Sequence, residues 1–274
     1  MSKAGSRRPI PSFKSAFTSS SGFNSGDFVV MGDCHANALF PALDTLGREQ
    51  GLSGIFLRSY LVPFKGIRFS FLGKDAFMNS DDTLRERQLA WLQRHPELRT
   101  VIIAQFWRAR AENVSYNRNL VHTADGTELT GKPIPMTILE PALRAYCKRV
   151  RDIGKELIIV APGPELDEAG NILQRHINNN FLLHRSIPPE TVSMTRERYR
   201  ERSAEWLACL DRLQAEGLCR VLPIAPALID NGDTFYSYSG GELFMRDTNH
   251  LTPAGAMKVM QELLPLLKKM LPRD

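Results

Sequence analysis

The sequence predicts an α/β protein with a parallel, doubly wound sheet of five strands and helices on both faces, three layers in all. Three observations favour this class. Short apolar runs alternate five times with amphipathic runs that have helical spacing. The short runs are apolar throughout, as in parallel strands that are buried on both faces. The chain of 274 residues is also long enough for one large domain with a full core.

Each predicted strand is one of the short apolar runs. The first run stops at Gly32 and the fourth stops at Pro162, residue types that commonly end a strand. In an open sheet of this kind the functional site lies beyond the carboxyl ends of the strands. The strands are expected at residues 27–31, 55–60, 100–105, 156–161 and 220–224.

The predicted helices are the amphipathic runs between these strands. Gly154 and Gly217 follow two of them as C-terminal stops, and Pro253 suits the first turn of the last helix. Two stretches rich in glycine, proline and polar residues, 116–135 and 162–193, are expected to be irregular. The helices are expected at residues 35–49, 81–95, 139–153, 195–216 and 253–270.

The first 26 residues differ in composition from the rest of the chain. Residues 1–26 are basic and rich in serine, and they lack the apolar segment of a signal peptide. We expect a flexible arm or linker here, followed by one domain over residues 27–274. No apolar run approaches the ~18 residues of a membrane-spanning helix, so no membrane span is predicted.

Charge and cysteine spacing argue against a nucleic-acid-binding protein and against a metal-binding motif. The chain has 35 Lys and Arg against 30 Asp and Glu, a net charge of +5. Acidic residues interleave with the basic ones, whereas a nucleic-acid-binding surface concentrates the basic residues on one face. No two cysteines have the two-residue gap of a zinc or redox motif. Cys147, Cys209 and Cys219 are expected to be small buried residues.

Two polar motifs remain, and the first follows the first predicted strand. Gly-Asp-Cys-His-Ala at residues 32–36 opens the first helix directly after that strand. Cys34 would therefore lie at a helix N-terminus, where free backbone N–H groups and the helix dipole stabilise a thiolate or an oxyanion. The alternative is that Cys34 is only a small residue in a tight turn.

The second motif, Asp-Thr-Asn-His at residues 247–250, comes just before the last helix. An aspartate three residues before a histidine can bond one imidazole nitrogen, which fixes the tautomer and leaves the other nitrogen free as a base. The alternative is that Asp247 or Thr252 caps the helix and that His250 is a surface histidine.

Together the two motifs resemble the SGNH/GDSL hydrolase superfamily, which has Gly-Asp-Ser at the first position and Asp-x-x-His at the last. They most resemble the extracytoplasmic SGNH domain that follows the membrane part of acyltransferase family 3 proteins. That branch typically has Gly-Asp-Ser-His-Ala and then Asp-x-x-His-Leu-Ser-x-x-Gly-Ala, where this chain has residues 32–36 and 247–256 with Thr252 in place of serine. Weaker matches lie at residues 41–43, 59–63 and 101–107.

The resemblance implies an SGNH-hydrolase-like domain with a flavodoxin-like sheet and ester chemistry on acyl groups. Cys34 then takes the place of the nucleophilic serine, His250 is the base and Asp247 orients His250. The backbone N–H of Cys34 contributes to the oxyanion hole, with Gln105 and Gly66 as further candidates. The resemblance implies neither a metal nor an organic cofactor.

Two residues after the third strand are candidates for substrate binding. Trp107 would offer an aromatic face to a sugar, or else it belongs to the core. Arg108 would meet an anionic glycan, or else it is simply solvated. In the family the substrate is an acyl group, usually acetyl, on surface carbohydrate such as the lipopolysaccharide O-antigen. A membrane acyltransferase domain is the implied acyl donor, and the periplasm is the implied location, with the cytoplasm as the alternative.

The exchange of serine for Cys34 leaves three functions open. The first is an acyl-transferring or deacylating enzyme that works through a covalent acyl-enzyme at Cys34. The second is a catalytically silent domain that keeps the fold and binds glycans or acts as a scaffold. The third is a cysteine enzyme of another kind, such as a thioesterase or a redox sensor.

Overall fold

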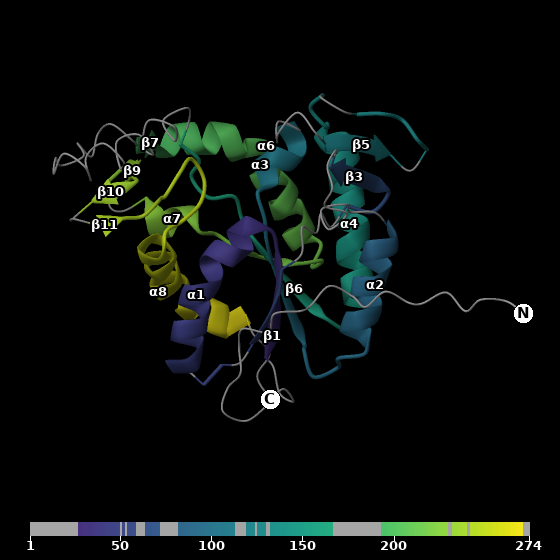
Figure 1. Ribbon diagram of the computed structural model, residues 1–274, viewed down its shortest axis with the longest axis horizontal. Coiled ribbons are helices and arrows are strands. Elements are labelled where there is room, and N and C mark those ends of the chain that lie inside the picture. The colour runs from purple at the N-terminus through teal and green to yellow at the C-terminus, as the bar shows by residue number, and fades with distance from the viewer. Residues whose placement is uncertain are drawn as a thin grey trace, which may run out of the picture.

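The structure is a computed structural model, shown in Figure 1. The predicted arm at residues 1–26 and most of the predicted irregular stretch at 162–193 lie outside the residues that it describes. Among the described residues, no helix has the length and apolar character that a membrane span requires. The described residues are 27–49, 51–52, 54–58, 64–71, 82–112, 119–123, 125–129, 132–166, 193–229, 232–239 and 242–270.

A five-stranded parallel sheet forms the centre of the molecule, in the order β2-β1-β4-β6-β8. All five predicted strands are confirmed, with ends that differ by at most two residues from the prediction. The strand order reverses beside β1, whose neighbours β2 and β4 lead away in opposite directions, and ligands bind at such a switch point. The strands are β1 (Phe28–Gly32), β2 (Gly54–Arg58), β4 (Thr100–Ala104), β6 (Glu156–Val160) and β8 (Arg220–Leu222).

Helices cover both faces of the sheet because successive strand residues point to opposite faces. Phe28 and Val30 of β1 belong to one apolar core, and Val29 and Met31 belong to the other. Figure 1 shows α1 and α8 on one side of the sheet and α2 and α4 on the other. The long helices are α1 (Cys34–Glu49), α2 (Asp82–Gln93), α4 (Met136–Asp152), α6 (Arg196–Ala215) and α8 (Pro253–Met270).

The two helical layers have separate cores. Helix α1 packs against α8 on the first face, and α4 packs against α6 on the second. Cys147, Cys209 and Cys219 are buried and unbridged, as the sequence predicts. Helix α4 begins three residues before its predicted start, because Pro135 already holds the extended conformation of a helix N-cap.

Several short elements were not predicted. The stretch at 116–135 that was expected to be irregular contains β5, whose antiparallel partner β3 lies about fifty residues earlier in the chain. Two more antiparallel pairs and two short helices flank the sheet. These elements are β3 (Ile67–Phe71), β5 (Asn119–Thr123), β7 (Ser193–Thr195), β9 (Thr234–Tyr236), β10 (Tyr238–Ser239), β11 (Glu242–Leu243), α3 (Trp107–Glu112) and α7 (Ala225–Leu228).

Candidate active site

The turn from β1 into α1 brings the first motif to the switch point of the sheet. Gly32 has φ 153°, and a Cβ at this position would lie 1.8 Å from the carbonyl oxygen of Ala104. Asp33, 2 % exposed, accepts a hydrogen bond from the backbone N–H of His35 at 2.9 Å and another from that of Phe106 at 3.0 Å. The Asp33 carboxylate therefore ties the start of α1 to the chain that leaves β4.

Cys34 is the first residue of α1, and its side chain is partly buried. Its Sγ lies 3.8 Å from Nδ1 of His35, and the nearest ring nitrogens of His35 and His250 lie within 4.8 Å of Sγ and of one another. Burial raises the pKa of the Cys34 thiol, but its interactions with His250 and His35 lower it more, so the pKa falls to about 6. The sulfur is therefore a thiolate at neutral pH, the nucleophilic form of cysteine.

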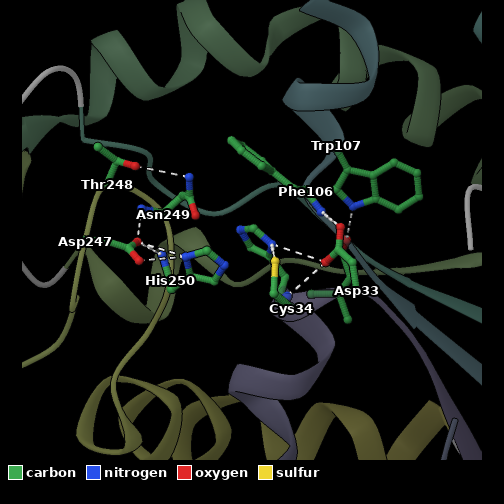
Figure 2. A network of polar contacts seen from close by, with 10 residues as sticks. Asp33, Cys34, Phe106, Trp107, Asp247, Thr248, Asn249 and His250 are labelled. Atoms are coloured by element: carbon green, nitrogen blue, oxygen red, sulfur yellow. Dashed lines mark hydrogen bonds and ion pairs between the residues drawn. The ribbon is translucent and has the colours of Figure 1, made fainter. Parts of the chain in front are cut away.

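The second motif forms an aspartate–histidine pair on the loop before α8, as Figure 2 shows. His250 Nδ1 lies 2.9 and 2.8 Å from the two carboxylate oxygens of Asp247. The backbone N–H groups of Asn249 and His250 donate to the same carboxylate at 3.0 and 2.8 Å. Burial raises the pKa of Asp247, but these bonds together hold it well below its usual range.

This pairing leaves the second nitrogen of His250 for chemistry. Within the described part of the chain, Nε2 of His250 is buried and has no hydrogen-bond partner. In Figure 2 the ring lies between Asp247 and Cys34. Burial lowers the pKa of His250, but its bond to Asp247 and its interaction with Cys34 raise it to about 9. The structure thus brings Cys34, His250 and Asp247 together, in the spatial order in which the sequence predicts a nucleophile, a base and an orienting carboxylate.

Sequence reasoning assigned no role to His35, which the structure places in the same site. Its Nδ1 lies 3.3 Å from Asp33 Oδ1, and its ring contacts the rings of Phe106 and His250, each at a centroid distance of 4.9 Å. Burial lowers the pKa of His35, but Asp33 and Cys34 raise it to about 10. Its position directly after the nucleophile was the available signal.

The side chains of Cys34, His35 and His250 lie close enough together to raise the question of a metal site. Cys34, His35 and His250 have the donor types that zinc prefers. However, the two imidazole rings stack with 30° between their planes. In addition, one nitrogen of each ring already faces a carboxylate, Asp33 for His35 and Asp247 for His250, so we interpret the cluster as a site of proton chemistry.

A small cavity of about 30 Å³ lies beside the site, at the carboxyl ends of β4 and β6. Its walls are mostly apolar, and His35, Gln105 and Asn249 add polar groups. Gln105 is 4 % exposed, and within the described region neither its amide nitrogen nor its amide oxygen has a hydrogen-bond partner. An amide with unmet donors at this position fits the predicted role of Gln105 as an oxyanion donor.

The structure does not bring Gly66, the other predicted oxyanion donor, to the cavity. Gly66 lies in the turn before β3, has φ 78°, and donates its backbone N–H to Oδ1 of Asp82 at 3.1 Å. It is not among the residues that line the cavity. Its N–H is therefore already bonded, and Gly66 serves a turn.

The two candidate substrate-binding residues are already engaged within the protein. Trp107 is 1 % exposed, donates its indole N–H to the carbonyl of Val160 at 2.7 Å and packs against Trp206. Trp107 belongs to the core, as in the second interpretation, and it also forms part of the cavity wall. Arg108 forms an ion pair with Glu165 at 3.2 Å, a contact that neither of its two predicted roles included.

Comparison with solved structures shows the same fold elsewhere. The periplasmic domain of a lipopolysaccharide acetyltransferase from Salmonella ser. Paratyphi A is similar at a TM-score of 0.60 and 16% identity, over 90% of this chain and 85% of that chain. The psychrotrophic esterase EstA from Pseudoalteromonas sp. is more distantly similar, at a TM-score of 0.43 and 12% identity over 90% of this chain and 98% of that chain. No curated protein matches the chain by sequence.

A family model matches most of the chain, although the identities to these solved structures are low. The family model of the SGNH domain that is fused to AT3 domains matches residues 10–265. This range contains the sheet, the β1–α1 turn and the loop before α8. The chain therefore belongs to the family of SGNH domains that are fused to AT3 domains.

Proposed function

We propose that this chain transfers an O-acyl group, most simply acetyl, to or from a surface carbohydrate such as the lipopolysaccharide O-antigen. The reaction passes through a thioester on Cys34. The observation that carries the proposal is the alignment of Cys34, His250 and Asp247 beside one small cavity at the switch point of the sheet. Family membership supports acyl chemistry, and the similarity to the Salmonella lipopolysaccharide acetyltransferase supports the carbohydrate substrate.

In the first half of the reaction the Cys34 thiolate attacks the carbonyl carbon of the acyl ester. A C–S bond forms, the C–O bond to the alcohol breaks, and Nε2 of His250 gives its proton to the leaving oxygen. In the second half a hydroxyl from water or from a sugar gives its proton back to Nε2 and attacks the thioester. The C–S bond then breaks, and the thiolate returns.

Negative charge develops on the carbonyl oxygen in both halves of the reaction, and hydrogen-bond donors must stabilise it. The backbone N–H of Cys34 lies in the first turn of α1, where N–H groups have no intrahelical acceptor. The amide of Gln105 adds a side-chain donor from the end of β4. We assign the oxyanion hole to these two groups.

The size of the cavity supports acetyl as the acyl group. A volume of about 30 Å³ holds about two water-sized groups, which suits a methyl carbon with its carbonyl. A thioesterase for long acyl chains would need a longer apolar channel. Both carboxylate oxygens of Asp247 lie within hydrogen-bond distance of Nδ1 of His250, and this pairing also favours an enzyme over a catalytically silent scaffold.

The acyl donor and the location follow from the family. Members are fused to AT3 domains, so we propose that a membrane acyltransferase domain supplies the acyl group to Cys34. The similarity to a periplasmic domain supports an extracytoplasmic location.

The test measures turnover of a chromogenic acetyl ester and uses mass spectrometry to look for acetyl on Cys34. Three proteins are compared, the chain itself, Cys34→Ser and His250→Ala. We expect an acetyl adduct on Cys34 in the chain, an adduct on the serine in Cys34→Ser, and loss of turnover in His250→Ala. His95→Ala is the control, because His95 is only partly buried and pairs with Glu97 away from the site. No turnover and no adduct in any of the proteins would reject the enzymatic function in favour of a binding domain.

A further inference from the structure

The sulfur of Cys34 lies between two aspartate–histidine pairs, of which the proposed reaction uses one. The first pair is Asp247–His250 on the loop before α8. The second is Asp33–His35 in the β1–α1 turn, with Nδ1 of His35 3.3 Å from Asp33 Oδ1 and 3.8 Å from Sγ. The reaction as written assigns no task to this second pair.

The side chain of His35 is held in place from several directions. Its backbone N–H donates to Asp33 Oδ1 at 2.9 Å, and the other oxygen of Asp33 accepts from Phe106 at 3.0 Å. The ring also contacts the rings of Phe106 and His250, and it forms part of the cavity wall. The imidazole is therefore fixed where it touches a reacting atom, the sulfur.

The surroundings of His35 determine where its proton lies. Nδ1 faces a carboxylate oxygen of Asp33 and the sulfur of Cys34, both hydrogen-bond acceptors, so this nitrogen carries a proton and donates. Among the described residues, His250 also packs against the ring, and behind it lie Asp247 and, 3.5 Å from Asp247, Nε of Arg246. Glu165 lines the same cavity as His35 and pairs with Arg108. The carboxylate of Asp33 offsets the charge of an imidazolium at His35.

We propose that His35, held by Asp33, is a second catalytic imidazole whose Nδ1–H bonds to the Cys34 sulfur and keeps it a thiolate. It keeps its proton while the thioester forms and breaks, and it stabilises the thiolate again when sulfur leaves the acyl carbon. His250 is thereby left to move the proton between the leaving and the attacking oxygen. The role in turnover depends on the proposed function, whereas the role in holding the thiolate does not.

The test titrates the Cys34 thiolate and needs no turnover. The thiolate is followed by ultraviolet absorbance and by the rate of alkylation with iodoacetamide against pH, with the modified cysteine located by mass spectrometry. The other three cysteines are buried, so they are expected to react slowly. The proteins are the chain, His35→Phe, His35→Asn and His250→Ala, with His95→Phe as the matched control.

We expect His35→Phe to raise the pKa of Cys34 by about one unit, which lowers alkylation below that pKa about tenfold. His35→Asn restores an N–H donor without the charge, so its pKa should lie between those of the chain and His35→Phe. His250→Ala should keep the pKa of Cys34 below that of a free thiol, about 8.5. His95→Phe should titrate like the chain.

Two results would overturn the proposal. One is a pKa of Cys34 in both folded His35 variants, checked by near-ultraviolet circular dichroism, that equals that of the chain. The other is a pKa of Cys34 in His250→Ala that equals the pKa of a free thiol, because His35 would then not stabilise the thiolate. A shifted titration without any ester turnover would instead reject the proposed function and keep the thiolate-holding role of His35.

Discussion

One atom separates this chain from the serine form of its motif, the sulfur of Cys34 in place of a hydroxyl oxygen. A serine gives up its proton only while it attacks, so its histidine must be neutral at the start. Cys34 has a pKa of about 6 and has already lost its proton at neutral pH. In the proposed reaction His250 therefore begins protonated and acts as an acid for the leaving alcohol.

These two pKa values predict a bell-shaped dependence of kcat/KM on pH. Turnover should rise as pH passes about 6, because Cys34 becomes a thiolate, and fall above about 9, because His250 loses the proton that it must donate. Asp247→Asn should move the upper limb to lower pH. Although burial opposes it, the bond to the Asp247 carboxylate raises the pKa of His250, and the variant removes that charge.

The same substitution should lower kcat by about 10²–10⁴, because an amide group beside Nδ1 no longer fixes the tautomer of His250. The oxygen of an asparagine can still accept from the backbone N–H groups of Asn249 and His250, so the loop should keep its shape. Asp44→Asn is the control, since Asp44 pairs with Arg48 on the outer side of α1. An unshifted upper limb in Asp247→Asn would contradict this assignment of His250.

At the scale of elements, the β1–α1 turn limits both stability and activity. A Cβ on Gly32 would lie 1.8 Å from the carbonyl oxygen of Ala104, which is backbone and has little room to move. Gly32→Ala should therefore lower the free energy of unfolding by about 3 kcal/mol or more and displace Cys34. Urea unfolding measures the first effect, and iodoacetamide alkylation measures the second.

Gly154→Ala is the control for this prediction. Gly154 also has a positive φ, 75°, but a Cβ there would have no heavy atom within 4 Å. Its cost should be about 1 kcal/mol, the penalty of the backbone conformation alone. Equal losses in the free energy of unfolding for Gly32→Ala and Gly154→Ala would mean that the backbone shifts to remove the clash with the carbonyl of Ala104.

The elements that could be predicted from the sequence are those that carry their own signal. Strands such as β4 and β6 are apolar throughout because helices cover both faces, and that pattern is local. Strand β5 has no such pattern, and its partner β3 is distant in sequence, so nothing local indicates the pairing. The same reason explains Gly66, whose N–H is taken by Asp82, sixteen residues away.

At the scale of the whole molecule, the parallel sheet makes the site predictable. Cys34 and His250 are more than 200 residues apart in sequence. Cys34 was predicted from its place directly after a strand, because sites lie beyond the carboxyl ends of strands, whereas His250 was predicted from its Asp-x-x-His motif and the family resemblance. The rule does not say which side chains at that edge face the cavity. The indole of Trp107 is held by the carbonyl of Val160 and the ring of Trp206, and both are tertiary contacts that the sequence does not indicate.

In the proposed function the same assembly selects the acyl group. The ends of β4 and β6, helix α7 and the loop before α8 line a cavity of about 30 Å³. A butyryl chain adds two methylene groups to acetyl, and forcing them into a packed wall costs about 1–3 kcal/mol. Acetyl esters should therefore be turned over roughly tenfold or more faster than butyryl esters, measured as kcat/KM on matched chromogenic esters.

Leu228→Ala tests whether this wall is the cause. Leu228 lines the cavity and is 4 % exposed, so its truncation should raise the ratio of butyryl to acetyl turnover. Leu263→Ala removes the same group from α8, away from the cavity, and should destabilise the protein without changing the ratio. Because the ratio is taken within one protein, loss of folded enzyme cancels. Equal turnover of both esters by the parent chain would show that the acyl group lies elsewhere.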